Sequence, residues 1–435
     1  MATVILNAAT DWSTSASTAL DNAKTAAGVG GTIIIPPGIY RLTQPFSPLA
    51  GQTLLGQSYL TTVLRCDFSA IANFAGTSMV RKYEPPPESA VVNPDVSVIG
   101  LCIDGGRSQC GRPTATGTNN EEAYGADCPE GAAGGISLGS GWLVSRCRIT
   151  NVNGPKTGCF GSNNARIEYC VWDNDDGGTG GQEDNLGGGG CVDLQIVGNV
   201  FKANCAGSGI DITTGARLLV EDNEIAFRSL IMEGIQGGII RRNVVYRATQ
   251  DADAGSINIK SNTAYGSATI AGAWCSRDFV IENNVVVNSY SPGIIISSTW
   301  DDKGPGDGVK DAGKYGQARG IYVRHNTVVR PFGLGIYAGG QDRARVDRHI
   351  EIVENTIIDP RAGTAGTGAE WNSGAGHFAC AGIGLGSGNF AQIIGNRVIR
   401  TSSAVSSSVA VVNGARGGTP TVKNTRLGDN VLVTL

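Results

Sequence analysis

The chain has 435 residues, of which 64 are glycine and 17% are charged, and its formal net charge is -4. Glycine is about twice as frequent as usual and charged residues are scarce, which is typical of β-rich chains with many tight turns. Because there is no basic excess and no lysine or arginine cluster, we expect no nucleic-acid partner. No apolar stretch approaches the ~18 residues of a membrane span and no secretory signal follows Met1, so we expect no membrane span.

The N-terminal segment predicts an amphipathic helix over residues 13–27. Ala16, Leu20 and Ala23 recur on one helical face behind a Ser13/Thr14 capping signal. Helices of this kind cover the terminal rung of a repeat array, which otherwise exposes strand edges and core. We expect residues 1–45 to form an N-terminal cap with the first strands, and residues 46–435 to form a β-helix with groove-forming loop insertions.

One pattern, apolar-x-x-Asn-x-apolar, recurs through the rest of the chain, and apolar residues alternate after each asparagine. The pattern includes IVGN, VEDN, IRRN, IENN, VRHN, IVEN, IIGN and LGDN, which end at Asn199, Asn223, Asn243, Asn284, Asn326, Asn355, Asn396 and Asn430. The shortest spacings are 24 and 20 residues. We interpret the spacings near 41 as two rungs with a weaker middle copy.

Rungs of this size cannot bury a core alone, so neighbouring rungs must stack as a solenoid. Leucine-rich repeats have a similar period, but Val and Ile outnumber Leu here and no amphipathic helix accompanies the rungs. We expect the recurrent asparagines to adopt the left-handed conformation of a sharp turn and to form an amide ladder. Cys147 and Cys170 occupy the asparagine position, which favours stacked structural thiols over catalytic ones. The sequence therefore predicts an all-β fold, a single parallel β-helix with a short N-terminal capping helix.

Three segments carry a resemblance to a known superfamily: GGTIIIPPGIYRLT at 30–43, LAGQTLLGQS at 49–58 and TVLRC at 62–66. Together with the asparagine rungs they resemble the pectin-lyase-like right-handed parallel β-helix superfamily, and the likeness covers essentially the whole chain. The resemblance implies polysaccharide as partner, because the superfamily includes polysaccharide lyases, glycosidases, sugar epimerases and phage tailspikes. For a spike it also implies a homotrimer. The triple-carboxylate signature of polygalacturonases is missing here, so function must be argued from sites.

Five insertions interrupt the rungs, at about 104–135, 172–190, 261–279, 299–319 and 359–381. Loops on a rigid solenoid commonly carry binding residues, so we expect these insertions to wall a groove. Aromatic rings stack on sugars and carboxylates bond hydroxyl groups. The substrate-binding candidates are Trp172, Asp173, Asp176, Trp300, Asp301 and Asp302. Calcium held between 173 and 184 is an alternative use of these acids, but no loop has the spacing of a calcium motif, so we expect neither a metal nor another cofactor.

Alternation along the strands predicts a set of outward polar side chains. Thr213, Glu233 and Lys260 share one outward column, and Asp211 and Asn258 lie in the column beside it. Because rungs are about 4.8 Å apart, Asp211 and Glu233 are expected to lie roughly 8 Å apart, which suits an inverting glycoside hydrolase. Lys260 is alternatively the base of a β-elimination. A solvated salt bridge between Glu233 and Lys260 is the structural alternative. We take Asp211, Glu233 and Lys260 as catalytic candidates and Asn258 as a substrate-binding candidate.

Two classes of function remain open at this point. One is an enzyme that cleaves polysaccharide, either a hydrolase or a lyase, including a phage tailspike-type depolymerase. The other is a non-catalytic virion structural, decoration or receptor-binding spike protein, for which the chain's last rung needs an assembly partner. Both classes place the protein outside the cell or on a virion.

Overall fold

The computed structural model describes residues 1–11, 13–74, 78–82, 93–106, 134–152, 157–173, 184–202, 207–246, 256–260, 276–289, 292–297, 318–331, 333–339, 347–361, 381–385, 388–401, 411–413, 422–423 and 426–434. They fall into two compact units, Met1–Ile210 and Asp211–Leu435. Among these residues, no helix is long and apolar enough to cross a membrane.

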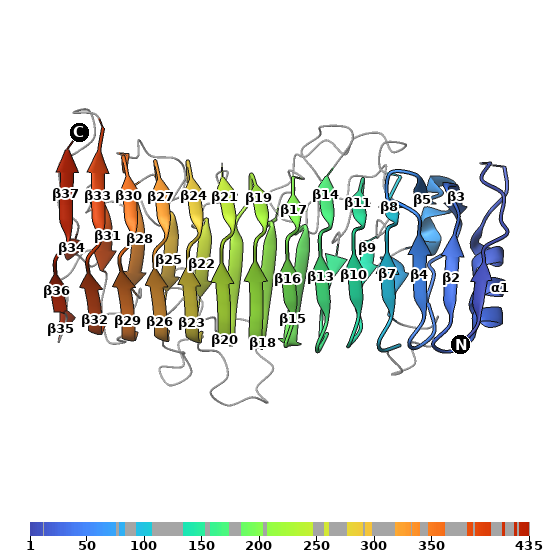
Figure 1. Cartoon of the computed structure of the whole chain (residues 1–435), viewed down its shortest axis with the longest axis horizontal. Helices are drawn as coiled ribbons and strands as arrows, with labels where there is room; N and C mark the ends of the chain where they lie inside the picture. The colour runs from blue at the N-terminus through green and yellow to red at the C-terminus, as the bar shows by residue number, and fades with distance from the viewer. Residues whose placement is uncertain are drawn as a thin grey trace, which may run out of the picture. The chain divides into compact units, whose positions relative to one another are not determined.

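The first unit is a parallel β-helix with three ladders of short strands (Figure 1). The first ladder contains β1 (Thr3–Ile5), β2 (Thr32–Ile35), β4 (Thr53–Gly56), β7 (Ser97–Ile99), β10 (Leu143–Ser145), β13 (Arg166–Glu168) and β16 (Gln195–Val197). The second contains β3 (Gly38–Leu42), β5 (Thr62–Cys66), β8 (Cys102–Asp104), β11 (Arg148–Thr150), β14 (Val171–Asp173) and β17 (Val200–Phe201). The third contains β6 (Ser78–Arg81), β9 (Gly134–Ser137), β12 (Thr157–Gly158) and β15 (Leu186–Val192).

The second unit repeats this plan with two longer strands at its start. Its first ladder contains β18 (Ile210–Glu221), β20 (Leu230–Arg241), β23 (Arg277–Glu282), β26 (Arg319–Arg324), β29 (Asp347–Val353) and β32 (Gly388–Ile394), followed by β35 (Val422–Lys423) and β36 (Arg426–Gly428). The second contains β19 (Glu224–Ala226), β21 (Val244–Tyr246), β24 (Val285–Val287), β27 (Thr327–Val329), β30 (Thr356–Ile358), β33 (Arg397–Arg400) and β37 (Val431–Thr434). The third contains β22 (Ile257–Lys260), β25 (Ile294–Ser297), β28 (Leu334–Gly339), β31 (Ala381–Leu385) and β34 (Val411–Asn413), and its first strand pairs with the start of β20.

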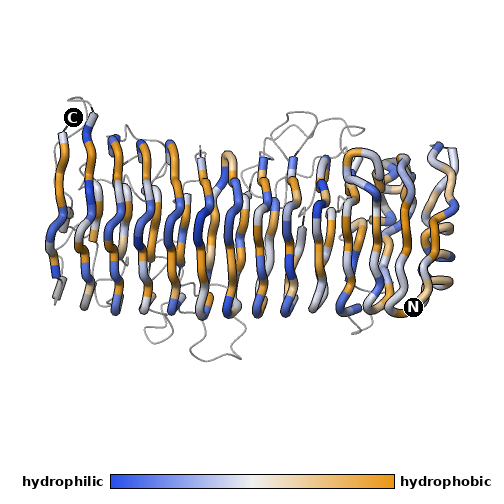
Figure 2. The backbone as a smooth tube through the Cα atoms, in the orientation of Figure 1, coloured by the Kyte–Doolittle hydropathy of each residue, from blue (hydrophilic) through white to orange (hydrophobic). Residues whose placement is uncertain are grey.

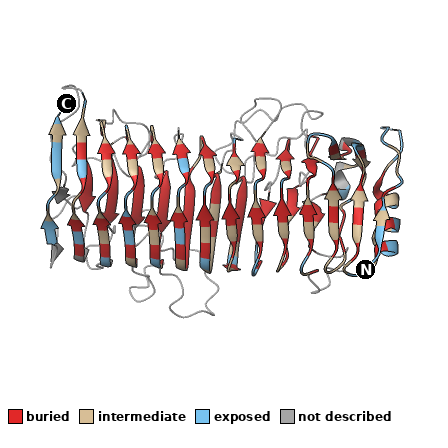
Figure 3. Cartoon of the chain, in the orientation of Figure 1, coloured by how far each residue is buried: buried red, intermediate tan, exposed pale blue. Residues whose placement is uncertain are grey.

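Apolar side chains at matching strand positions stack into columns inside each unit. One column of the first unit is fully buried and contains Ile33, Leu54, Val98, Val144, Ile167 and Ile196. A column of the second unit, also buried, contains Val245, Val286, Val328, Ile357 and Val398. Each such side chain contributes about 1.5–3 kcal/mol on leaving water. The period-2 alternation is visible as buried and half-buried residues along the strands (Figure 3) and as alternating hydropathy (Figure 2). The predicted all-β solenoid is confirmed.

An asparagine ladder runs through the second unit, as predicted. The backbone N–H and the side-chain Nδ2 of each asparagine both donate to Oδ1 of the next one, at 2.9–3.1 Å. The members are Asn223, Asn243, Asn284, Asn326, Asn355, Asn396 and Asn430. Nδ2 also donates to a carbonyl of the preceding coil, for example from Asn284 to Ile240 at 2.9 Å. Buried backbone groups at this turn are thereby satisfied.

The interpretation of the longer spacings was wrong. Asn243 and Asn284 are 41 residues apart and bond to each other directly, and Asn284 bonds to Asn326 at a spacing of 42. Each such spacing is therefore one coil that carries a long insertion. A spacing in sequence does not reveal how much of a coil leaves the strand ladder.

The expected left-handed conformation belongs to a different residue. It is adopted by the residue before each ladder asparagine, for example Asp222 (φ 57°), Arg242 (φ 54°), His325 (φ 56°) and Glu354 (φ 54°). The asparagine itself follows the turn, where its amide reaches both neighbouring coils. The conformational cost of a left-handed non-glycine residue is met by the hydrogen bonds that the ladder makes beside it.

Cysteines occupy the asparagine position in the first unit. The N–H of Cys170 donates to Oδ1 of Asn199 at 2.9 Å, and the N–H of Cys147 contacts Sγ of Cys170 at 3.4 Å. The Cys170 thiol lies 3.6 Å from the Val144 carbonyl and 3.2 Å from that of Glu168, which match the carbonyls reached by a ladder amide. The structural role expected for these thiols is supported by this geometry.

Six cysteines of the described residues are buried: Cys66, Cys102, Cys147, Cys159, Cys170 and Cys191. Burial, with the nearby carboxylates of Asp67 and Asp104, raises the pKa of Cys66 to about 12. This thiol is therefore protonated at neutral pH and is a poor nucleophile.

The N-terminal helix is shorter than predicted. Helix α1 spans Ser17–Ala27 and contacts β1 and β2, with Leu20, Ala23 and Ala27 buried. The predicted apolar face is confirmed, but the Ser13/Thr14 cap is wrong, because the helix begins after Ala16 and no side chain caps it. Ser13 instead donates its N–H to Asp11 Oδ1 at 2.9 Å.

Removing an interior ladder amide is expected to destabilise the second unit. Asn326→Ala removes the oxygen that accepts two buried hydrogen bonds from Asn284, one from its backbone N–H and one from its Nδ2. Each buried donor left without an acceptor costs about 1–3 kcal/mol. We expect a loss of about 3 kcal/mol in the free energy of unfolding, measured by urea denaturation. Asn430→Ala is the matched control: its ladder bonds are only partly buried, so water replaces them and the loss is below about 1 kcal/mol. Equal losses would contradict the role assigned to burial.

Candidate functional site

The candidate site lies on the outer face of β18, β20 and β22, within the second unit. Strands β18 and β20 are neighbours of equal length. The ladder bond between Asn223 and Asn243 sets their offset at 20 residues. This offset places Asp211 beside Ile231 and Thr213 beside Glu233. The side chains of Ile210 and Ile212 are buried and point inward. The alternate residues of the strand, Asp211 and Thr213, are half-buried.

Glu233 and Lys260 are direct register partners on neighbouring strands. Nζ of Lys260 lies 3.0 Å from Oε1 of Glu233, and the two side chains are only 8% and 9% exposed. This is the geometry of a charge-assisted hydrogen bond between ionised groups. The predicted neighbour relation of Glu233 and Lys260 is confirmed, but the pair is not the solvated salt bridge that was the structural alternative, because it is largely withdrawn from water.

The column beside this pair faces outward and is nevertheless buried. Ile231, Asn258, Ile295 and Tyr337 are register partners on β20, β22, β25 and β28, and they are 7% exposed or less. Inward residues on either side of them, such as Ile257 and Ile259, are buried too. Strands buried on both faces are covered outside as well as inside. The candidate site is therefore sheltered, which strengthens electrostatic interactions within it.

Two of the predicted substrate-binding residues have structural partners. Trp172 was expected on a groove wall, and this is wrong: its side chain is fully buried on β14, stacked on Phe201 at 4.4 Å and donating Nε1–H to Oγ1 of Thr157 at 3.1 Å. Asp173, half-buried on the same strand, accepts from Nε of Arg148 at 2.9 Å. The apolar alternation of β14 explains the error, since a tryptophan next to an acidic loop can still occupy the inward position.

The remaining binding candidates lie outside the described residues. They are Asp176, Trp300, Asp301 and Asp302, together with most of the five predicted insertions. They stay predictions. In the part of the chain that the structure describes, no group of three or more His, Cys, Asp or Glu residues is arranged to hold a metal ion.

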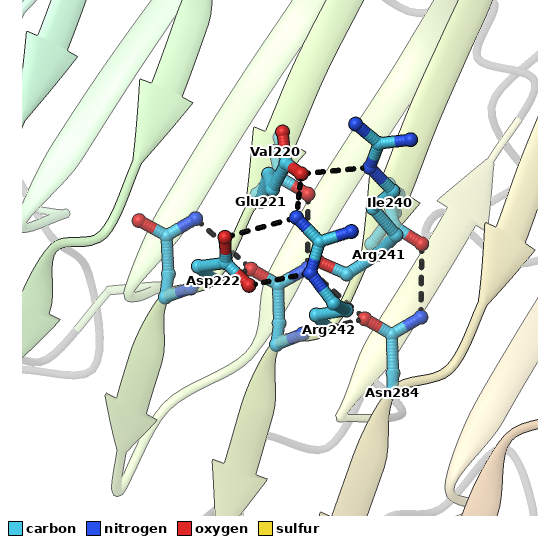
Figure 4. Close-up of polar contacts among 9 residues, drawn as sticks. Val220, Glu221, Asp222, Ile240, Arg241, Arg242 and Asn284 are labelled. Carbon is cyan, nitrogen blue, oxygen red and sulfur yellow. Dashed lines mark hydrogen bonds and ion pairs between the residues drawn. The ribbon is translucent and has the colours of Figure 1, made fainter.

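A second charged cluster of the same unit, formed by Glu221, Asp222, Arg241 and Arg242, can be compared with the Glu233/Lys260 pair (Figure 4). Glu221 accepts from Nε of Arg241 at 2.8 Å and also from Arg242. Arg242 in turn donates to both carboxylate oxygens of Asp222, at 2.8 and 3.0 Å. The side chains of Arg242 and Asp222 are 47% and 46% exposed. The side chain of Glu221 is only 11% exposed, but its partner Arg242 and Asp222 reach solvent, unlike either member of the Glu233/Lys260 pair, and the cluster lies beside the ladder turn.

Comparisons with solved structures give the fold a name. A family 28 exopolygalacturonase from Yersinia enterocolitica superposes with a TM-score of 0.60 at 12% identity, over 98% of this chain and 78% of that one. A GH87 α-1,3-glucanase catalytic unit from Streptomyces thermodiastaticus gives 0.52 at 16% identity, over 99% and 68%. The A-module of a mannuronan C-5 epimerase from Azotobacter vinelandii gives 0.53 at 13% identity, over 99% of both chains. The chain shares the right-handed parallel β-helix fold of these proteins, which is the fold that the sequence resemblance implied.

No family model matches the sequence, and no curated protein matches it. At identities of this size the similarity concerns the fold, and the chemistry has to come from the side chains of this chain.

Breaking the Glu233/Lys260 pair is expected to cost far more than breaking an exposed pair. Glu233→Gln removes a carboxylate from a sheltered ammonium, so we expect the free energy of unfolding to fall by about 3 kcal/mol. Adding Lys260→Met should restore a large part of it, because the remaining charge is then also removed.

The matched control is the cross-coil pair of Glu282 and Arg324, 2.9 Å apart, in which the arginine is 50% exposed. Glu282→Gln should change stability by at most about 1 kcal/mol. Urea denaturation of all variants measures both effects, and similar losses from the two glutamates would refute the sheltered character of the site.

Proposed function

We propose that this protein is a polysaccharide-cleaving enzyme that hydrolyses glycosidic bonds at the outer face of β18, β20 and β22. The observation that carries the proposal is the sheltered Glu233/Lys260 pair one coil away from Asp211. Carboxylates at such positions are the groups that glycoside hydrolysis requires. The solved structures with this fold support the substrate class, because the names of two of them are those of a polygalacturonase and a glucanase.

The proposed roles follow from the surroundings of each group. Glu233, whose carboxylate is held in place by Nζ of Lys260 at 3.0 Å, is the base that takes a proton from the attacking water. Asp211 donates a proton to the leaving glycosidic oxygen. The coil spacing of about 4.8 Å and the offset of two residues put the two carboxyl groups roughly 8 Å apart, which leaves room for the water of an inverting reaction. Asn258 is a hydrogen-bonding candidate for a sugar hydroxyl.

Hydrolysis is favoured over β-elimination by the contact that Lys260 makes. An eliminating base needs an amine that reaches the substrate, whereas Nζ of Lys260 is engaged with the Glu233 carboxylate at 3.0 Å. Lys260 is therefore a positioning residue for Glu233 in this proposal.

The test is cleavage of a panel of acidic and neutral polysaccharides, followed by reducing ends and by the ultraviolet absorbance of unsaturated ends. We expect reducing ends without unsaturated ends. Asp211→Asn and Glu233→Gln should each lower the rate by about 10²-fold or more, assayed below the unfolding temperature of each variant. Glu282→Gln, which breaks a cross-coil pair outside the site, should leave the rate unchanged. Full rates in both site variants would show that the catalytic groups lie elsewhere.

A phage tailspike-type depolymerase is the finer form of this proposal. A non-catalytic spike or decoration protein of a virion is the second candidate function. The observation that favours an assembly role is a set of exposed apolar side chains on the last strands, Leu427 (57%), Val431 (48%) and Leu432 (38%). Exposed apolar groups that lie together mark surfaces for protein partners.

The assembly role predicts a homotrimer in which these side chains are covered. Light scattering should then give three times the mass of the 44.9 kDa chain, and Leu427→Lys should lower it to that of one chain. A monomeric wild-type protein would contradict the trimer, and a trimer that binds every glycan of the panel without cleaving it would favour the second candidate over the first.

A further inference from the structure

A column of cations crosses successive coils on the first ladder of the second unit. Arg277, Arg319 and Arg348 are direct register partners on β23, β26 and β29. Gln236 precedes them in the column, and Asn389 on β32 and Lys423 on β35 follow them. We call Arg277 and Arg319 the arginine column. Neighbouring coils therefore place a cation against a cation.

The arginine column differs from the other cross-coil arginines of the molecule. Arg65 faces Asp104 at 2.7 Å, Arg241 faces Glu221 at 2.8 Å, and Arg324 faces Glu282 at 2.9 Å. In those places a carboxylate of the adjacent coil neutralises the guanidinium. Like charges on facing strand positions are destabilising. Where Arg41 faces Arg65 in the first unit, each guanidinium has its own carboxylate partner, Asp67 or Asp104, whereas the guanidinium of Arg319 has none among the described residues.

The arginine column is also open to solvent. Arg319 is exposed, and its guanidinium makes no hydrogen bond or ion pair with any residue that the structure describes, although its backbone N–H donates to the Ser276 carbonyl at 3.2 Å. Arg277 is 36% exposed, donates to Oε1 of Gln236 at 2.6 Å and lies 3.9 Å from the exposed carboxylate of Asp278. Much of the hydrogen-bonding capacity of these guanidinium groups is therefore directed at solvent.

We propose that the arginine column is a binding surface for an acidic polysaccharide, separate from the cleavage site. Guanidinium groups pair with carboxylates through two parallel hydrogen bonds. The coils repeat the cation about every 4.8 Å, and a uronic acid polymer repeats a carboxylate on every sugar. A uronic acid polymer that lies across the coils can therefore present successive carboxylates to successive arginines of the column. The inference rests on the proposed function for its polysaccharide partner, and it names that partner as acidic.

Binding is measured separately from cleavage, by affinity electrophoresis in gels that contain polygalacturonate, chondroitin sulfate or neutral dextran. All proteins carry Glu233→Gln, so that cleavage does not interfere. We expect retardation by polygalacturonate that weakens with added salt, and none by dextran. Arg277→Gln with Arg319→Gln should weaken binding by about tenfold. The control, Arg241→Gln with Arg324→Gln, removes the same charge from paired positions and should weaken it much less.

A second measurement uses the unaltered column. Phenylglyoxal modifies exposed arginines, and polygalacturonate should protect Arg277 and Arg319 from it, as read by peptide mass spectrometry, while leaving Arg242 reactive. Equal loss of binding in the two double variants, no protection, or equal retardation by double-stranded DNA would overturn the proposal. Stronger retardation by chondroitin sulfate than by polygalacturonate would also overturn it, since it would assign the column to sulfate groups. Neither gel retardation nor protection from phenylglyoxal depends on turnover. The two measurements therefore test binding at the arginine column even if the protein cleaves no polysaccharide.

Discussion

The asparagine ladder is the interaction on which the rest of the structure depends. Each coil has to turn sharply between its first and second strand ladders, and that turn buries backbone N–H and carbonyl groups. Asn284, like its counterparts, donates two hydrogen bonds to the next coil and one to a carbonyl of the preceding coil. The same amide thereby fixes the stacking register. Once the register is fixed, every outward side chain has a defined neighbour one coil away.

A fixed register makes the outer surface of the second unit a set of charge columns. On β20 and β22 it brings Glu233 against Lys260 in a sheltered place, where an ion pair is strong and costly to break. On β20, β23 and β26 it alternates Arg241, Glu282 and Arg324 at partly exposed positions. The first pairing holds a carboxylate in a sheltered site where it can take part in a reaction, and the second gives the outer surface charged groups that interact with water. Both consist of acidic and basic side chains. Burial, more than residue identity, separates them.

The thiols of the first unit show how far the ladder tolerates substitution. Cys170 accepts the contact from one coil and approaches the two carbonyls that a ladder amide would reach. A thiol is a weaker donor and acceptor than an amide, so the turn needs a small polarisable group that reaches both neighbours rather than an amide in particular. The pattern of apolar residues around the turn, preserved in both units, supplies most of the remaining stability.

The sequence by itself determined the solenoid, the ladder and the outward column of Glu233 and Lys260, because period-2 alternation and a recurrent turn residue are local properties. It also contained the arginine column, whose members stand seven residues before Asn284 and Asn326, so that alignment on the ladder makes it visible. Only the tertiary structure decided that a spacing of 41 residues is one coil, that Trp172 stacks in the core, and that the face around Asn258 is sheltered. These depend on which segments leave the ladder and what covers it, and contacts between distant residues determine both.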